Sequence, residues 1–162
     1  MKLYFLRHAS ASDVASSDAE RKLTKEGEEE ARIAGAALAK LGVQPAHIFS
    51  SPLVRARQTA QIAAKELMFS GDIGTLDELL NDTSTPSLLT ALKSVGIANE
   101  LLLVGHVPSL SEHLAALVGA KNAECFPLGK GSIACVELDR LRVGAGQLRW
   151  LMRQKQLRLI AG

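Results

Sequence analysis

The chain has 162 residues and a formal net charge of +2, and a chain of this size is expected to fold as one domain, residues 1–162, around one core. Apolar residues make up 47% of the chain but aromatic residues only 4%, so Ala, Leu, Val and Ile must form that core, as they do where helices cover a buried sheet. The small net charge and the absence of any run of five Lys or Arg residues exclude nucleic-acid binding through bulk charge.

Six short apolar runs predict strands, and segments of helical periodicity lie between most of them. The predicted strands cover residues 2–6, 47–50, 73–76, 101–104, 132–138 and 147–152. The predicted helices cover residues 24–41, 53–68, 86–95 and 108–118.

The order of these elements predicts the topology of the sheet. Strands that alternate with helices are joined by crossovers and therefore run parallel. The last two strands are connected only through residues 139–146, which is too short for a crossover and predicts an antiparallel hairpin. The predicted fold class is α/β, a three-layer α/β/α sandwich with a mixed, mostly parallel sheet.

One long segment, Ala9 to Leu23, has neither helical nor strand periodicity and is rich in Ala, Ser and Asp. Loops of this length in compact domains are usually functional or disordered. Because the segment follows His8 directly, we predict that it forms a mobile lid.

Polar residues follow three of the predicted strands, and these are His8, Ser50 with Ser51, and His106. Ligands of open α/β sheets bind beyond the carboxyl ends of the strands, so we expect these side chains to share one crevice. Arg55 and Arg57 lie in the first turn of a predicted helix, where a cation opposes the helix dipole at a cost of about 0.3–1 kcal/mol. Their presence indicates an anion at that helix end, although Arg57 fits an ordinary surface position equally well.

These motifs resemble those of the histidine phosphatase superfamily, also called the phosphoglycerate mutase-like family. The family's Arg-His-Gly motif corresponds to Arg7-His8-Ala9, its second arginine motif to the run from Ser51 to Ala60, and its second histidine to Gly105-His106. The family's Leu-Thr-x-x-Gly helix start corresponds to the run from Leu23 to Gly27. An arginine just before that run, Arg21, makes the small bacterial SixA-type phosphohistidine phosphatases the best-fitting subgroup. The resemblance extends over nearly the whole chain.

The resemblance implies a phosphatase that works through a covalent intermediate. His8 would attack phosphorus as a neutral imidazole, and Arg7, Arg55 and His106 would hold the phosphoryl oxygens, since phosphoryl transfer depends mainly on positioning and charge stabilisation. The neighbouring arginines should lower the pKa of His8 and keep its lone pair available. We expect no metal, because arginines beside the two histidines would repel a cation. We also expect no organic cofactor, and the sequence has no GxGxxG or Walker loop that would bind a nucleotide cofactor.

Three further residues, Ala9, Glu78 and Arg21, bear on the backbone beside His8 and on the class of substrate. Ala9 stands where the family has glycine, so the backbone there must avoid a positive φ or accommodate a methyl group near the phosphate. Glu78 matches the general acid of ester-cleaving members, and an ester needs a proton donor more than phosphohistidine does. Arg21 either contacts substrate or neutralises acidic neighbours in the sequence.

The short segment after Glu78 indicates the class of substrate. Only 26 residues separate Glu78 from Gly105, too few for a crossover helix together with the helical insertion that caps mutases and acid phosphatases of this family. An open site favours phosphohistidine on a signalling or phosphocarrier protein. The alternatives are a small-molecule phosphomonoesterase with Glu78 as general acid, and a non-catalytic module that binds phosphate or phosphohistidine.

The two cysteines, Cys125 and Cys135, match no metal-ligand spacing, and the sequence shows neither a signal peptide nor a membrane span. We therefore expect a cytoplasmic protein with reduced thiols and without a membrane or nucleic-acid partner.

Overall fold

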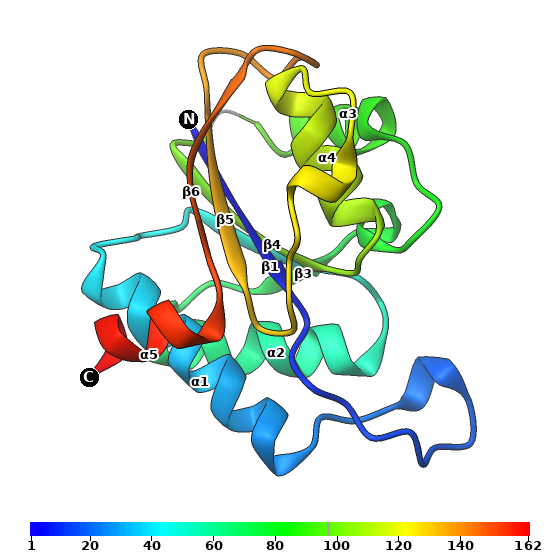
Figure 1. Ribbon diagram of the computed structural model, residues 1–162, viewed down its shortest axis with the longest axis vertical. Helices are drawn as coiled ribbons and strands as arrows, with labels where there is room; N and C mark the ends of the chain where they lie inside the picture. The colour runs from blue at the N-terminus through cyan, green and yellow to red at the C-terminus, as the bar shows by residue number, and fades with distance from the viewer. Residues whose placement is uncertain (97) are drawn as a thin grey trace.

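A six-stranded sheet in the order β3-β2-β4-β1-β5-β6 forms the centre of the computed structural model, which describes residues 1–96 and 98–162 (Figure 1). Strands β1, β2, β3 and β4 are mutually parallel, whereas β5 is antiparallel to both of its neighbours, β1 and β6. The mixed, mostly parallel sheet and its final hairpin are thus confirmed. The strands are β1 (Lys2–Arg7), β2 (His47–Ser50), β3 (Ile73–Thr75), β4 (Glu100–Gly105), β5 (Ile133–Leu138) and β6 (Gly146–Met152).

Helices cover both faces of the sheet, which confirms the three-layer α/β/α arrangement (Figure 1). One apolar cluster joins α1, α2 and α5 to the sheet, and the other joins α3 and α4 to its opposite face. The helices are α1 (Lys25–Lys40), α2 (Val54–Glu66), α3 (Thr85–Val95), α4 (Ser109–Val118) and α5 (Gln154–Ala161). Three short 3₁₀ helices accompany them, η1 (Asp18–Glu20), η2 (Asp77–Leu79) and η3 (Ala123–Cys125).

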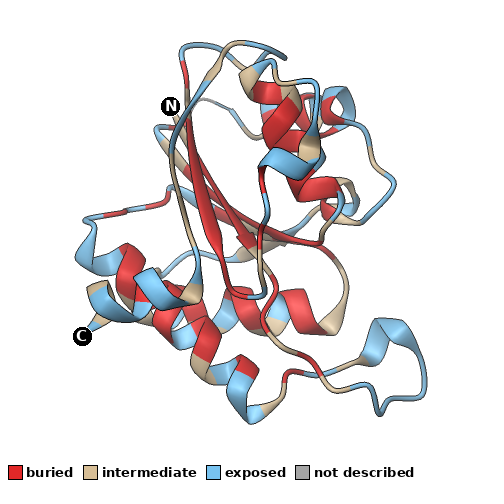
Figure 2. Ribbon diagram, viewed as in Figure 1, coloured by how far each residue is buried: buried red, intermediate tan, exposed pale blue. Residues whose placement is uncertain are grey.

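The two central strands are buried on both faces (Figure 2). Residues 3–6 of β1 and 101–104 of β4 are each at most 3% exposed. Covering a parallel strand on both faces requires a continuous apolar run rather than an alternating pattern, and both strands have such a run. None of the helices that the structure describes combines the length and apolar composition that a membrane span requires.

The short C-terminal helix α5 was not predicted from the sequence. Leu157 is buried, and Ile160 and Ala161 pack beside it on the same core, so the helix has an apolar stripe, but its eight residues contain only one i, i+3, i+4 repeat of that pattern. Its position is fixed by Gln154, whose Nε2 donates to the carbonyl oxygens of Glu30 at 3.0 Å and Gly131 at 2.8 Å. These contacts hold α5 against α1 and the loop before β5.

The segment between β1 and α1 is attached to the start of α1. Thr24 caps the helix by accepting a hydrogen bond from the backbone N–H of Gly27 at 3.0 Å, and its own N–H donates to the carbonyl oxygen of Ser10 at 3.0 Å. A side chain at Gly27 would overlap that same carbonyl of Ser10, so the position requires glycine. Residues 9–23 lack regular structure except for η1 and a bridge between Ala11 and Leu23.

Candidate active site

The carboxyl ends of β1, β2 and β4 lie side by side at one edge of the sheet. In the register of these strands, Arg7 is paired with Gly105, and Ser50 with Val104. The backbone N–H of His8 donates to the carbonyl oxygen of Gly105 at 3.0 Å, and that of Ser51 donates to Val104 at 3.0 Å. The sheet therefore brings together His8, Ser51 and His106, which are far apart in the sequence.

The two histidines face each other in a tilted arrangement, with ring centroids 4.8 Å apart. His8 is 8% exposed, and its Nδ1 lies 2.8 Å from the carbonyl oxygen of Ala9. Because a carbonyl can only accept, Nδ1 carries the proton of the neutral ring and Nε2 keeps its lone pair. Burial, assisted by the charges of His106, Arg55 and Arg7, lowers the pKa of His8 to about 3, so the ring is neutral at neutral pH.

The backbone beside the nucleophile candidate is fixed by Thr59 of α2. The Thr59 hydroxyl accepts a hydrogen bond from the N–H of Ala9 at 3.1 Å and donates to the carbonyl oxygen of Arg55 at 2.7 Å. Ala9 does not adopt a positive φ, so alanine fits here without the conformational freedom of glycine. Thr59 lies inside the second arginine motif, but its role in holding Ala9 was not predicted from the sequence.

Arg7 and Arg55, the two candidate phosphate-binding arginines, are each held by a hydrogen bond to a backbone carbonyl oxygen, and each keeps an Nε–H group without a partner in the described part of the chain. Arg7 Nη1 donates to the carbonyl oxygen of Leu128 at 2.8 Å, and burial lowers the pKa of this guanidinium. The Nε atoms of Arg7 and Arg55 are buried without a hydrogen-bond partner among the described residues. Unpaired buried N–H groups are unfavourable, so an anion that accepts from them would be strongly favoured.

A third unpartnered polar atom at this edge belongs to His106. Its Nε2 lies 2.6 Å from the hydroxyl of Ser51, whereas its Nδ1 is buried without a partner in the described part of the chain. Burial is the main cause that lowers the pKa of His106 to about 4, and the charge of Arg55 acts in the same direction. Like His8, this ring is neutral at neutral pH.

The segment between β1 and α1 reaches the site through Asp18. Arg55 donates from Nη1 to the Asp18 carbonyl oxygen at 2.7 Å and from Nη2 to the Asp18 carboxylate at 3.1 Å. Arg21 bonds within the same segment, to the carbonyl oxygen of Ser12 at 2.8 Å, to Asp13 at 2.7 Å and to Asp18 at 3.2 Å. Asp18 had no recognisable signal in the sequence, because it stands in an irregular run of small and polar residues.

Glu78 and Arg57 lie at the margin of this arrangement. Glu78 is half-buried in η2, at the same edge of the sheet, and its carboxylate has no hydrogen bond or ion pair in the portion that the structure describes. The next residue, Leu79, places its carbonyl oxygen 2.8 Å from where a Cβ on Gly105 would lie, so glycine permits this close approach. Arg57 is exposed, unlike the buried Arg55 one half-turn earlier.

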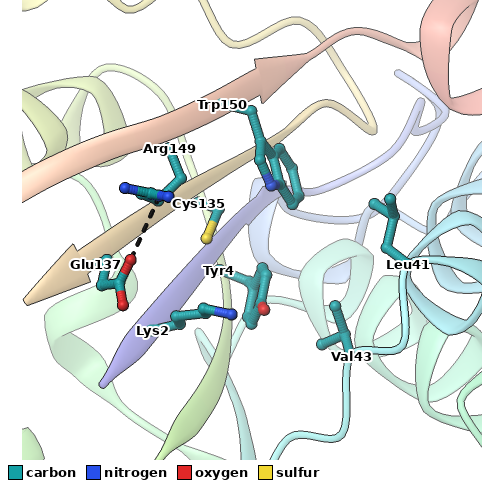
Figure 3. A pocket seen from close by; sticks show the side chains of 8 residues that line it. All are labelled: Lys2, Tyr4, Leu41, Val43, Cys135, Glu137, Arg149 and Trp150. Carbon is teal, nitrogen blue, oxygen red and sulfur yellow. Dashed lines mark ion pairs between the residues drawn. The ribbon is translucent and has the colours of Figure 1, made fainter.

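A separate hollow lies beside the amino-terminal half of β1, away from these groups (Figure 3). Two of the side chains that line it pair with each other, Arg149 Nε lying 3.3 Å from Glu137 Oε2. Lys2 Nζ lies 3.9 Å from Oε1 of the neighbouring Glu100, to which the Tyr4 hydroxyl donates at 3.0 Å. Among the described residues, those lining this hollow include no buried polar side-chain atom without a partner, unlike those at the edge with His8. Within the described residues, no cluster of three or more His, Cys, Asp or Glu side chains could hold a metal ion.

Comparisons with known proteins agree with this geometry. Residues 3–81 match the family model of the histidine phosphatase superfamily (branch 1). The chain is 30% identical to the phosphohistidine phosphatase SixA of Escherichia coli over 98% of both chains, and 35% identical to an uncharacterized protein of Picosynechococcus over 90% of both. The structure of the protein histidine phosphatase SixA complexed with tungstate superposes with a TM-score of 0.87, at 27% identity, over 97% of this chain and 99% of that one. The chain therefore belongs to the histidine phosphatase superfamily.

Proposed function

We propose that this phosphatase hydrolyses phosphohistidine on a partner protein, through a covalent phosphohistidine intermediate on His8. The observation that carries the proposal is the neutral, buried His8 with a free Nε2, lying beside unpartnered donors from Arg7, Arg55 and His106. A nucleophile next to preorganised donors is the arrangement that phosphoryl transfer requires.

In the first step, Nε2 of His8 attacks phosphorus and forms a P–N bond. The P–N bond to the partner's imidazole breaks at the same time, and the bonding pair leaves with that ring. The equatorial oxygens accept hydrogen bonds from the Nε groups of Arg7 and Arg55 and from His106. If the distal nitrogen of the partner's ring is protonated, a neutral imidazole leaves, so this step needs no general acid.

In the second step, water attacks the phosphorus bound to His8. The P–N bond to His8 breaks, inorganic phosphate is released, and the ring returns to its neutral form. The Ala9 carbonyl oxygen, 2.8 Å from Nδ1, stabilises the positive charge that the ring carries while it is phosphorylated. The same contact orients the ring toward the phosphoryl group in both steps.

Two observations support a protein-borne phosphohistidine as the substrate. The 30% identical relative is itself a phosphohistidine phosphatase. The connection from β3 to β4 contains only η2 and α3, both of which pack on the sheet and the neighbouring helix, so these elements add no cap over His8. We expect the partner to be a signalling or phosphocarrier protein of the cytoplasm, where the free Cys125 and Cys135 would stay reduced.

Trapping the phosphoenzyme tests the nucleophile. After a short incubation with a radiolabelled phosphohistidine protein, the label should appear on His8 in an acid-labile, alkali-stable form. His8→Ala should abolish the label, and the control His47→Ala, at an exposed histidine on β2, should retain it. A chain that turns over substrate without any labelled His8 would contradict the mechanism. A chain that binds phosphate without turnover would be a binding module instead.

Comparing two substrates tests the substrate class. Release of phosphate from a phosphohistidine protein should exceed release from a small phosphate ester, and Glu78→Gln should leave the phosphohistidine reaction largely intact. Faster ester cleavage that disappears in Glu78→Gln would instead identify a small-molecule phosphomonoesterase with Glu78 as its general acid.

A further inference from the structure

The hydrogen bond between Ser51 and His106 determines which nitrogen of the histidine carries its proton. The Ser51 side chain is fully buried, and the only partner of its hydroxyl among the described residues is His106 Nε2, at 2.6 Å. A buried hydroxyl hydrogen without an acceptor is unfavourable, so it points at the one acceptor available. Nε2 therefore accepts the bond and is unprotonated, which leaves the proton of the neutral ring on Nδ1.

The opposite tautomer would leave two polar groups unsatisfied. If Nε2 donated to Ser51, the hydroxyl hydrogen would have no partner in the part of the chain that the structure describes. The Nδ1 lone pair, which is buried without a partner, would then face negatively charged phosphoryl oxygens whenever substrate was bound. Only an Nδ1–H group can donate to those oxygens.

We propose that Ser51 is a positioning residue, which holds His106 in the Nδ1–H tautomer so that this nitrogen donates to the phosphoryl group. The inference deepens the proposed function and rests on it for the presence of the phosphoryl group. Ser51 itself need not touch the substrate, because it acts through the ring of His106. Ser51 and His106 directly follow β2 and β4, which are neighbours in the sheet, so the hydrogen bond joins the carboxyl ends of two adjacent strands.

Long-range nitrogen-15 NMR of the histidine side chains tests the tautomer without any substrate. At pH 7, His106 should show a protonated, pyrrole-type Nδ1 and an unprotonated, pyridine-type Nε2. Ser51→Ala should shift this pattern toward a mixture of tautomers, and Ser51→Thr, which keeps the hydroxyl, should preserve it. The matched control is Ser50→Ala, because the hydroxyl of the equally buried Ser50 donates to the Ser51 carbonyl oxygen at 3.0 Å and has no other partner among the described residues. A protonated Nε2 in the unmodified protein would overturn the inference.

Kinetics then link the tautomer to catalysis. Ser51→Ala should lower kcat about tenfold, because His106 remains present but spends part of its time in a form that cannot donate. KM should change much less than kcat, and Ser51→Thr should restore most of the rate. An unchanged kcat in Ser51→Ala, with a shifted tautomer, would show that Nδ1–H does not assist the reaction.

The phosphoenzyme experiment and the NMR experiment together distinguish a failure of this inference from a failure of the proposed function. If no phosphoenzyme forms on His8 but the tautomer responds to Ser51 as expected, the proposed function fails while the hydrogen-bond assignment stands. If the phosphoenzyme forms but Nε2 is the protonated nitrogen, the phosphatase mechanism stands and the role of Ser51 is wrong.

Discussion

Asp18 binds the guanidinium of Arg55, the arginine that the proposed mechanism assigns to the phosphoryl group. Arg55 donates from Nη1 to the Asp18 carbonyl oxygen and from Nη2 to its carboxylate, at 2.7 and 3.1 Å. The hydrogen bond from Arg55 is the main cause that lowers the pKa of Asp18, so the carboxylate is ionised at neutral pH. A carboxylate and a phosphoryl group accept from the same guanidinium donors, and the two therefore compete for Arg55.

We expect Asp18→Asn to tighten the binding of inorganic phosphate about two- to fivefold. The gain is small because the Asp18 side chain is 66% exposed, and ion pairs this accessible to solvent contribute little. The inhibition constant of phosphate against turnover, measured at constant ionic strength, checks the effect. Asp13→Asn is the control, because Asp13 pairs with Arg21 in the same segment, whereas the hydrogen bonds that Arg55 donates among the described residues go to Asp18. Equal effects of the two substitutions would mean that net charge, not competition for Arg55, governs phosphate affinity.

Arg55→Gln should lower kcat/KM about 10- to 100-fold. Each charge-assisted hydrogen bond contributes about 1.5–3 kcal/mol, and Arg55 offers the phosphoryl group a buried Nε as well as the groups now bonded to Asp18. Steady-state kinetics with a phosphohistidine protein measure the loss. Arg57→Gln removes the same charge from an exposed position of α2 and should change kcat/KM less than twofold. Similar losses in both variants would argue that α2 supplies only a diffuse positive field.

Thr59→Val should lower both stability and kcat, although valine has nearly the same shape as threonine. The substitution leaves the buried N–H of Ala9 without its acceptor, which costs about 1–3 kcal/mol in the free energy of unfolding. It also removes a restraint on Ala9, the residue whose carbonyl oxygen orients the ring of His8. Chemical denaturation and turnover assays measure the two effects, and Thr59→Ser, which keeps the hydroxyl, should recover most of both. A fully active and stable Thr59→Val protein would show that the strand pairing alone fixes Ala9.

The strands and the final hairpin were predictable, because burial imposes a continuous apolar run on β1 and β4 and only a short connection joins β5 to β6. The same applies to the meeting of His8 and His106, since both directly follow parallel strands that pair in the sheet. The order of the strands in the sheet was not predicted. Helix α5 was not predicted because its eight residues contain only one i, i+3, i+4 repeat, formed by Leu157, Ile160 and Ala161.

The contacts that complete the site could not be predicted, because they depend on how irregular segments fold in three dimensions. Asp18 reaches Arg55 across 37 positions in the sequence, through a segment without periodicity. The role suggested for Arg21 remains a prediction, and its guanidinium bonds to Ser12, Asp13 and Asp18 in this structure. Ser51 was recognised as a strand-end residue, but its partner depends on the rotamer of His106.

The stability of the fold should decrease as the pH falls below about 6.5, partly because of His113. This histidine is fully buried between α4 and the start of α3, where its Nδ1 lies 2.9 Å from the Thr85 hydroxyl, as expected for a packed side chain. Burial lowers its pKa from 6.5 to about 4. The unfolded chain therefore binds the proton at a higher pH than the folded chain, so the stability contributed by the neutral ring is complete above about pH 6.5 and declines toward pH 4.

One such histidine gives a slope of at most about 1.4 kcal/mol per pH unit in the free energy of unfolding, and His8 and His106 act in the same direction. Denaturant titrations between pH 5 and pH 7 should give a shallower slope for His113→Gln than for the unmodified protein, whatever its absolute stability. His47→Gln, at an exposed position of β2, should leave the slope unchanged. A slope that His113→Gln does not reduce would mean that His113 can be protonated without unfolding, and hence that the pocket between α3 and α4 admits the charged ring.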